Sequence, residues 1–581
     1  MRLPKMNILA ASRTVTEIFA GYNHNLRIGD GEFYDMKNLT SAYYPILSPR
    51  GKRGIYNRAE KPRGLLAKDA LCYVDGGTLY IGEHAVEGLT LDPNTEKTLV
   101  SMGAYIIILP DKKYVNSTNT TDFGSIEASV TTTAEVTFSL CRLDGSAYAE
   151  SIGTEEPETP TDKQYWIDTS TKPHTLKQYS EKSEMWMSVA TTYIKISAPG
   201  IGTPFSQYDG VTISGIKGET EKTDLDAIDG AFVVWERGDD YLVILGMLDE
   251  TASVNIPVTV ARKMPKTDFI IESENRLWGC RYGLADGKPV NEIYASKQGD
   301  FKNWNCFMGL STDSYVASVG TDGAFTGAFT YLGYPHFFKE NFVHKVYGSY
   351  PANYQIQTTA CRGVEKGSGK SLAMVNETLF YKAKTGICAY DGSLPSEISS
   401  ALGEVNYSDA VACAHGNKYY VSMKDAGGVF TLFVFDVARG LWHKEDNTQV
   451  DAFCSCRNDL CYIENEKGGI RTIIGGREDE GEIRWMAETG IISADAPDRK
   501  YISALNVRMS LALGAAVSFF IRYDSMGEWE HICTRTATNL YSFTMPILPR
   551  RCDHFRLRIE GKGDAKIYSI TKTVGQGSDT R

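Results

Sequence analysis

Short apolar runs that alternate with polar turns cover most of the chain from about residue 62. Two early stretches, 64-GLLAKDALCYVDGGTLYIG-82 and 98-TLVSMGAYIIILPDKKYVN-116, each predict a strand, a polar turn and a second strand. The pattern returns at 268–296 and then in segments that start at 327, 371, 410 and 451, a spacing of about 40 residues. This repeat predicts a mainly β fold, a β-propeller of six or seven blades. Several unrelated antiparallel sheets are the alternative interpretation.

Two other regions have a different pattern. Residues 117–263 combine an acidic, Pro-rich stretch, 154-TEEPETPTD-162, with alternating runs typical of exposed antiparallel strands, and they predict a small inserted β domain. After about residue 480, six strand-like runs with turn signals near ten-residue spacing predict a β-sandwich. The predicted parts are an extended N-terminal arm (1–61), the first propeller blades (62–116), the inserted β domain (117–263), the remaining blades (264–480) and the C-terminal β-sandwich (481–581).

Charge is distributed unevenly along the 581 residues. The formal net charge is −11, but residues 1–63 carry a net +6 and residues 117–263 a net −12. A protein that grips DNA without sequence preference should be basic over its binding face, and this chain as a whole is not. The wall of a channel through which DNA slides should not be strongly basic. The net charge of this chain is therefore compatible with a DNA conduit but is no evidence for one. We expect neither a membrane span nor a signal peptide, because the chain has no long apolar run and no cleavage signal near its start.

The stretch 361-CRGVEKGSGKSLAM-374 comes close to a phosphate-binding loop. Gly369, Lys370 and Ser371 supply the second half of Gly-x-x-x-x-Gly-Lys-Ser/Thr, but position 364 is Val where the first Gly is required. The residues that follow have no helical periodicity and predict two short strands instead. We therefore interpret this stretch as a flexible surface connection between β units.

The sequence offers no arrangement of residues that is typical of catalysis. Asp and Glu are plentiful, but no motif singles out a pair, and the nine His form no metal-binding motif. His336 and His344 are expected to be ordinary blade residues. Cys454, Cys456 and Cys461 lack a fourth ligand at zinc-finger spacing. The sequence therefore predicts no catalytic residue, no cofactor and no metal, and a protein that is not an enzyme.

Four stretches resemble structural proteins of phages and prophages of Gram-positive bacteria. They are 30-DGEFYDMKNLTSAYYPILSPRGKRG-54, 273-SENRLWGCRYG-283, 291-NEIYASKQGDFKNW-304 and 309-GLSTDSYVASVGTDGAFTGAFTYLGYPHFFKENFVHKVYG-348. The architecture resembles the tail nozzle or tail-hub proteins of short-tailed phages. That resemblance implies a hexameric ring below the portal and its adaptor, through which double-stranded DNA passes without sequence-specific binding. It implies location in the virion tail after synthesis in the host cytoplasm, and docking of fibres or tail-tip proteins.

Three hypotheses about function follow. The first is a structural virion protein, a nozzle or hub subunit that acts as an ejection conduit and a docking platform. Its basic arm and acidic insert provide complementary charges between subunits, and the candidate partner-docking residues in the arm are Asp30, Glu32, Arg50, Lys52 and Arg53. The second is a tail-tip adhesin that binds cell-wall carbohydrate. The third is a propeller enzyme that degrades polysaccharide.

Overall fold

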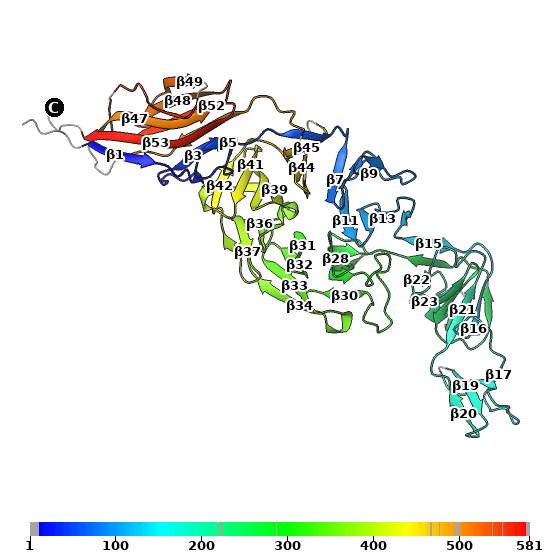
Figure 1. Cartoon of the computed structure of the whole chain (residues 1–581). Coiled ribbons are helices and arrows are strands. Elements are labelled where there is room, and N and C mark those ends of the chain that lie inside the picture. The colour runs from blue at the N-terminus through cyan, green and yellow to red at the C-terminus, as the bar shows by residue number, and fades with distance from the viewer. Residues whose placement is uncertain are drawn as a thin grey trace, which may run out of the picture.

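The protein is an elongated β molecule with three parts, seen in the computed structural model in Figure 1. A propeller forms the middle, an inserted β domain projects from one side of it, and a C-terminal β-sandwich lies at the other end. None of the described helices is long and apolar enough to cross a membrane. The structure describes residues 11–172, 174–219, 223–285, 287–464, 468–475, 477–493, 500–536, 539–548 and 550–576.

Seven antiparallel blades of four strands each form the propeller in the described residues, numbered here in chain order of their innermost strands. Six blades are separate four-stranded sheets, and the strands of blade 6 belong to a ten-stranded sheet. Blade 1 contains β7 (Pro62–Ala67), β8 (Leu71–Asp75), β9 (Thr78–Ile81) and β10 (His84–Ala85), and blade 2 contains β11 (Thr98–Met102), β12 (Tyr105–Leu109), β13 (Lys113–Asn116) and β14 (Phe123–Ser125). Blade 3 contains β27 (Phe269–Ser273), β28 (Arg276–Ala285), β29 (Lys288–Ala295) and β30 (Tyr315–Ser318). Blade 4 contains β31 (Gly327–Tyr331), β32 (Tyr334–Lys339), β33 (Phe342–Tyr347) and β34 (Gln355–Ala360).

The last blade is completed by a strand from the N-terminal arm. Blade 5 contains β35 (Ala373–Val375), β36 (Thr378–Ala383), β37 (Gly386–Tyr390) and β38 (Ser396–Glu397). Blade 6 contains β39 (Tyr407–His415), β40 (Lys418–Asp425), β41 (Phe430–Asp436) and β42 (Leu441–Lys444). Blade 7 contains β43 (Ala452–Cys456), β44 (Asp459–Ile463), β45 (Ile470–Ile474) and, from the arm, β6 (Gly54–Asn57). Strand β6 pairs antiparallel with β45, more than 400 residues later in the chain. The early and late parts of the sequence are thereby joined in one sheet.

Tight two-residue turns connect the first two strands of most blades. Glu274–Asn275 joins β27 to β28 and Asn376–Glu377 joins β35 to β36, and all four residues have positive φ. Two consecutive positive φ values are the signature of a type I′ turn, whose twist matches that of the paired strands. These turns set the register, so that the apolar side chains of each strand alternate toward the neighbouring blades.

Seven apolar clusters between successive blades show that the ring is closed. Blades 1 and 2 share the cluster around Leu79 and Ile106, and the series continues around the ring to the cluster around Tyr73 and Cys461, which joins blade 7 back to blade 1. Each blade thus buries both of its faces against its neighbours. Burial of apolar surface on this scale is the main source of stability in a propeller.

The inserted domain lies between blades 2 and 3. Its eight-stranded sheet surrounds one apolar core and contains β15 (Ala128–Thr131), β16 (Val136–Cys141), β21 (Tyr193–Ser197), β22 (Gly210–Ser214), β23 (Gly230–Gly238), β24 (Tyr241–Leu245), β25 (Ala252–Val254) and β26 (Thr259–Arg262). A second, four-stranded sheet forms the far tip of the insert (Figure 1) and contains β17 (Glu150–Gly153), β18 (Tyr165–Asp168), β19 (Thr175–Ser180) and β20 (Met185–Ser188).

The C-terminal sandwich incorporates strands of the N-terminal arm in both of its sheets. One sheet contains β1 (Ala11–Thr16), β47 (Lys500–Leu511), β50 (Tyr541–Thr544), β51 (Arg551–Cys552) and β53 (Ala565–Gln576); the other contains β3 (Glu32–Lys37), β46 (Arg484–Thr489), β48 (Ala516–Tyr523), β49 (Glu530–Thr536) and β52 (Phe555–Lys562). Strand β2 (Gly21–Tyr22) pairs with both β3 and β42, so the second sheet continues into blade 6. The remaining short elements are β4 (Leu39–Thr40), β5 (Ser48–Pro49), η1 (Thr223–Ile228), η2 (Pro351–Asn353), η3 (Gly369–Ser371) and η4 (Ser400–Leu402).

The prediction of a mainly β propeller with an inserted β domain and a C-terminal sandwich is confirmed. The structure settles the blade number at seven. Strand β14, within the interval 117–263, pairs with β13 in blade 2, and the sheets of the insert run from Ala128 to Arg262. The arm, expected to be extended, contributes six short strands to three different sheets and a hairpin.

Candidate functional site

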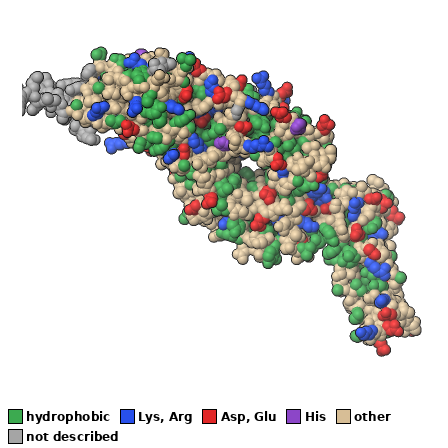
Figure 2. All heavy atoms as spheres, viewed as in Figure 1, with side chains coloured by type: hydrophobic (Ala, Val, Ile, Leu, Met, Phe, Trp, Pro, Cys, Tyr) green, Lys and Arg blue, Asp and Glu red, His purple; other side chains and the backbone are tan. Residues whose placement is uncertain are grey.

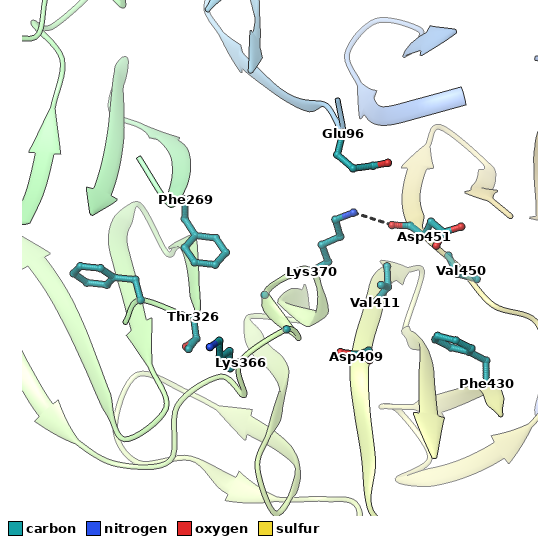
Figure 3. A pocket seen from close by; sticks show the side chains of 13 residues that line it. Glu96, Phe269, Thr326, Lys366, Lys370, Asp409, Val411, Phe430, Val450 and Asp451 are labelled. Atoms are coloured by element: carbon teal, nitrogen blue, oxygen red, sulfur yellow. Dashed lines mark hydrogen bonds between the residues drawn. The ribbon is translucent and has the colours of Figure 1, made fainter. Parts of the chain in front are cut away.

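A cavity of about 460 Å³ opens where the innermost strands of the blades begin. Six of the seven blades contribute to this cavity, which we call the mouth. Figure 3 shows the Glu96 and Lys370 side chains directed toward the open space. Its lining consists of Glu96, Phe269, Phe325, Thr326, Lys366, Gly367, Gly369, Lys370, Asp409, Val411, Phe430, Val450 and Asp451.

The Gly-rich stretch singled out in the sequence forms one wall of the mouth. Gly369–Ser371 forms η3, a single turn of three residues that leads into β35, so the stretch does not open a long helix. Ser368 and Ser371 are buried, and their hydroxyls accept hydrogen bonds from the backbone N–H groups of Ala410 and Lys382, at 3.1 and 3.0 Å. The stretch is therefore anchored to two blades, in contrast to the flexible connection expected from its composition.

The glycines of this stretch allow two mouth residues to approach closely. A Cβ atom at Gly369 would lie 2.7 Å from the ring of Phe269, and one at Gly367 would lie 2.9 Å from a carboxylate oxygen of Asp409. Gly367 also has a φ of +90°, which other residues rarely adopt. The two glycines thus make room for one aromatic ring and one carboxylate rather than for a phosphate.

A β-bulge in blade 6 sets the position of Asp409. The register of β39 against β40 shifts between Ser408 and Val411, and Asp409 has a φ of +49°. A bulge locally changes the direction in which a side chain points. The Asp409 carboxylate lies in the mouth and forms an ion pair with Lys424.

Further charged groups face the mouth from three other blades. Lys370 donates a hydrogen bond from Nζ to the backbone oxygen of Asp451 at 3.0 Å, and Glu96 extends from the segment before β11 toward the same region (Figure 3). Lys366 is exposed at the rim. The mouth therefore presents three carboxylates and two ammonium groups that come from residues far apart in the chain.

Aromatic rings complete the lining. Phe269 and Phe430 are half-buried, whereas Phe325 is almost fully buried and lies under the Lys339 ammonium group, 4.7 Å from the ring centre. Aromatic faces beside carboxylates and ammonium groups offer both apolar contact and hydrogen bonds to a ligand. Such a combination suits a polyhydroxylated molecule such as a sugar chain.

The three mouth carboxylates were missed by the sequence analysis. A signal existed, because both 409-DAVAC-413 and 451-DAFCSC-456 place an Asp at the start of a repeat unit. Residues at equivalent positions in propeller repeats are brought together at one end of the ring. Only the closed ring shows that Glu96, from a turn before β11, joins them.

The His and Cys residues considered in the sequence lie inside the blades. Nδ1 of His336 lies 2.9 Å from the Tyr334 backbone oxygen, and His344 contacts the Thr321 and Thr358 hydroxyls. Burial lowers the pKa of each of these imidazoles to about 4. Cys454, Cys456 and Cys461 are buried in the core between blades 7 and 1. Within the described residues, no group of three or more His, Cys, Asp and Glu side chains could hold a metal ion.

The candidate docking residues of the arm fall into two groups. Arg50 pairs with Glu480 at 2.6 Å and Arg53 pairs with Glu445 at 2.7 Å, and both Arg side chains are buried. Asp30 accepts hydrogen bonds from Lys572 and Thr16, and Glu32 accepts from Asn23 and from the Gly29 backbone. These four side chains therefore bind within the chain. Lys52 is exposed beside them, and the docking role of all five residues stays a prediction.

Comparison with known proteins gives structural matches only. No family model matches the chain, and no curated protein sequence does. The structure is similar to an exo-β-1,3-galactanase from Phanerochaete chrysosporium, with 8% identity, a TM-score of 0.22 and coverage of 52% of this chain and 94% of the other. It is also similar to an engineered GH43 glycoside hydrolase with endo-xylanase and exo-arabinofuranosidase activity, with 8% identity, a TM-score of 0.19 and coverage of 53% and 96%.

A third match covers nearly the whole chain. It is the extracellular domain of a putative hybrid two-component system from B. thetaiotaomicron, with 8% identity, a TM-score of 0.17 and coverage of 92% of this chain and 95% of the other. At these identities the likeness concerns the fold alone and gives no correspondence between individual residues.

The comparisons correct one expectation. From the sequence we predicted a protein that is not an enzyme, whereas the first matched structures are glycoside hydrolases. This finding stands against the prediction, which rested on the lack of a recognisable motif in the linear sequence.

Proposed function

We propose that this protein binds and hydrolyses polysaccharide at the mouth of its propeller. The observation that supports this proposal is the convergence of Glu96, Asp409 and Asp451 on one cavity that is also lined by aromatic rings. Glycoside hydrolysis needs one carboxyl group that protonates the leaving oxygen and a second carboxylate that acts as nucleophile or base. Side chains from different blades can flank a bound sugar chain from opposite sides.

The three carboxylates have different environments. Asp409 is paired with Lys424 and lies against the Gly-rich wall, which suits the role of nucleophile or base. Glu96 is exposed on the opposite side of the mouth, and Asp451 lies next to the Lys370 contact. Glu96 and Asp451 are therefore the candidates for the proton donor.

The test measures the release of reducing ends from soluble β-linked galactans, xylans and glucans by the full chain. Asp409→Asn should lower the turnover by about a hundredfold or more, because a positioned acid or base contributes about that much to the rate. Glu96→Gln and Asp451→Asn are the companion variants. Asp69→Asn is the matched control, since Asp69 is exposed in the turn between β7 and β8. Absence of turnover on every substrate, or full activity in all three mouth variants, would overturn the proposal.

We propose as a second candidate that the chain is a tail nozzle or hub subunit of a short-tailed phage. Its support is the arrangement of a propeller with β domains projecting on two sides, together with the resemblance of four sequence stretches to phage structural proteins. In this role the chain would form a hexameric ring in the virion tail, below the portal and adaptor. The ring would pass double-stranded DNA and dock fibres or tail-tip proteins.

Electron microscopy of the recombinant protein beside its parent particle tests the second candidate. Sixfold rings that match density below the portal are the expected result. Monomers in solution, with density only at the periphery of the tail, would contradict the ring. The two candidates are compatible, because one concerns the chemistry of the mouth and the other concerns the assembly that carries it.

A further inference from the structure

The four-stranded sheet at the tip of the insert has two different faces. Side chains alternate between the faces along each strand. Ile167 and Leu176 point to one face, where they are buried with Leu140 against the body of the insert. The other face, which we call the tip face, therefore points away from the insert, at the far end of the molecule (Figure 1).

Three aromatic rings from three adjacent strands share the tip face. Trp166 of β18 is opposite Lys177 of β19 in the register, and Tyr179 of β19 is opposite Trp186 of β20. The Trp186 ring lies 5.4 Å from Trp166 and 5.3 Å from Tyr179, with interplanar angles of 65° and 58°. Trp166 is 5% exposed, whereas Tyr179 and Trp186 are half-buried. A buried ring thus supports two rings that reach the solvent.

A fixed ion pair stands beside the rings. The Lys177 ammonium group lies 2.7 Å from Asp168 and 4.9 Å from the centre of the Trp166 ring. The other oxygen of Asp168 accepts a hydrogen bond from the Ser170 hydroxyl, so the carboxylate is held in place. An ammonium group has three donors, and the contact with Asp168 leaves capacity for a ligand hydroxyl.

The charge around the tip face determines which ligands are favoured. Residues 150–189 contain eight acidic and four basic side chains, a formal net charge of −4, and acidic side chains are visible at this end of the molecule in Figure 2. This surplus repels polyanions such as nucleic acids and phosphate-containing wall polymers. A chain of uncharged sugars, with apolar ring faces and hydroxyl edges, matches the combination of rings and polar groups.

We propose that the tip face is a binding site for an uncharged polysaccharide, whose sugar rings stack on Trp186 and Tyr179 while their hydroxyls bond to the Lys177–Asp168 pair. This site belongs to the insert rather than to the propeller repeats and does not depend on hydrolysis at the mouth. It gives the molecule a second contact with carbohydrate, and two contacts on one chain raise the overall affinity for a polymer.

Affinity electrophoresis of the full chain tests the site. The protein is run in native gels that contain soluble arabinoxylan, mixed-linkage β-glucan or dextran, and retardation by at least one of them is expected. Trp186→Ala and Tyr179→Ala should each raise the dissociation constant by about tenfold or more, as expected for aromatic residues that carry binding energy. Met185→Ala is the matched control, because Met185 directly precedes Trp186 on β20, is 59% exposed and has no ring.

Two further variants distinguish the loss of this site from a loss of the fold and from an effect of the mouth. Circular dichroism shows whether Trp186→Ala disturbs the fold. If it does, Trp186→Phe takes its place, because it keeps an aromatic ring and should restore part of the retardation. Trp186→Ala is also measured on the Asp409→Asn background, in which hydrolysis at the mouth is blocked, and the loss of retardation caused by Trp186→Ala should be the same on both backgrounds. Migration of the wild-type protein unaffected by all three polysaccharides, or a folded Trp186→Ala variant with unchanged affinity, would overturn the proposal and leave the tip face to a protein partner.

Discussion

At the scale of single residues, the propeller buries three imidazoles in their neutral form. His443 of β42 is buried, and burial, with a smaller effect of the nearby Lys418 charge, lowers its pKa to about 3. His336 and His344 have their pKa lowered to about 4 for the same main reason. Their ordinary pKa is 6.5, so each of them binds a proton more readily in the unfolded chain. This difference makes the stability of the fold depend on pH.

The sign of that dependence gives a first prediction. Between pH 6.5 and about 3 the unfolded state binds more protons than the folded state, so the free energy of unfolding should decrease as the pH falls through this range. At about pH 5, each of these imidazoles should lower the free energy of unfolding by about 1–2 kcal/mol relative to neutral pH. Thermal unfolding between about pH 7 and pH 5 should show the decrease, and His443→Gln should make it less steep. His84→Gln is the control, since His84 is exposed on β10; an identical slope in His443→Gln and wild type would contradict the prediction.

At the scale of elements, the N-terminal arm is held by buried ion pairs. Arg53 contacts Glu445 at 2.7 Å and Asp446 at 3.0 Å in the segment after β42, and the side chains of Arg53 and Glu445 are each 6% exposed. Arg50 binds Glu480 through both terminal nitrogens, at 2.6 and 2.8 Å. The arm enters blade 7 as β6 directly after Arg53. These contacts therefore fix the strand that closes the propeller.

Removing one partner of this cluster gives a second prediction. Arg53→Ala leaves the buried Glu445 carboxylate without its closest cation and should lower the free energy of unfolding by about 3 kcal/mol or more. Lys52→Ala, one residue away and exposed, should change it by no more than about 0.5 kcal/mol. Denaturation in guanidinium chloride measures both values. If the two variants were equally stable, the buried pair would not hold the arm.

At the scale of the whole molecule, the insert joins the propeller through its two chain ends and also contacts blade 3. Lys112 of the propeller binds Glu127 at 2.6 Å and the Met264 backbone oxygen at 3.1 Å, and the Met264 N–H donates to Glu127 at 3.0 Å. The two ends of the insert are therefore neighbours. Apart from this junction, Asn303 of blade 3 bonds to Asp209 and Gly210 of the insert.

Replacing residues 128–262 by a short Gly-Ser linker tests this organisation as a third prediction. The propeller and sandwich should stay folded, and the free energy of unfolding should fall by about 1–3 kcal/mol because the buried Asn303 amide loses its hydrogen bonds to Asp209 and Gly210. Turnover at the mouth should persist, whereas retardation by polysaccharide through the tip face should disappear. Gel filtration and circular dichroism check the fold. Aggregation, or loss of cooperative unfolding, would show that the insert is required by the propeller core.

Much of the fold could be predicted because strands and tight turns are specified by residues close together in the sequence. The two apolar runs on either side of the turn in 98-TLVSMGAYIIIL-109 and the positive-φ turn at Asn376–Glu377 belong to neighbouring residues, so the sequence displays them directly. The two candidate sites could not be predicted in the same way, because their residues are far apart in the sequence or depend on strand register. Asp409 reaches the mouth through a β-bulge, and the tip face requires the register of Tyr179 against Trp186, which no local pattern specifies.

The sequence alone determined the β class, the repeat of about 40 residues, the position of the insert and the sandwich at the C-terminal end, because each of these follows from contacts between residues close in the chain. Only the tertiary structure decided that there are seven blades, that β6 from the arm completes the last of them, and that Glu96, Asp409 and Asp451 face one cavity. These features depend on pairings across hundreds of residues. The packing of each blade against its neighbours in the closed ring decides which of these distant segments meet. Residues that meet in this way can stand at any separation in the sequence, so no local pattern reveals them.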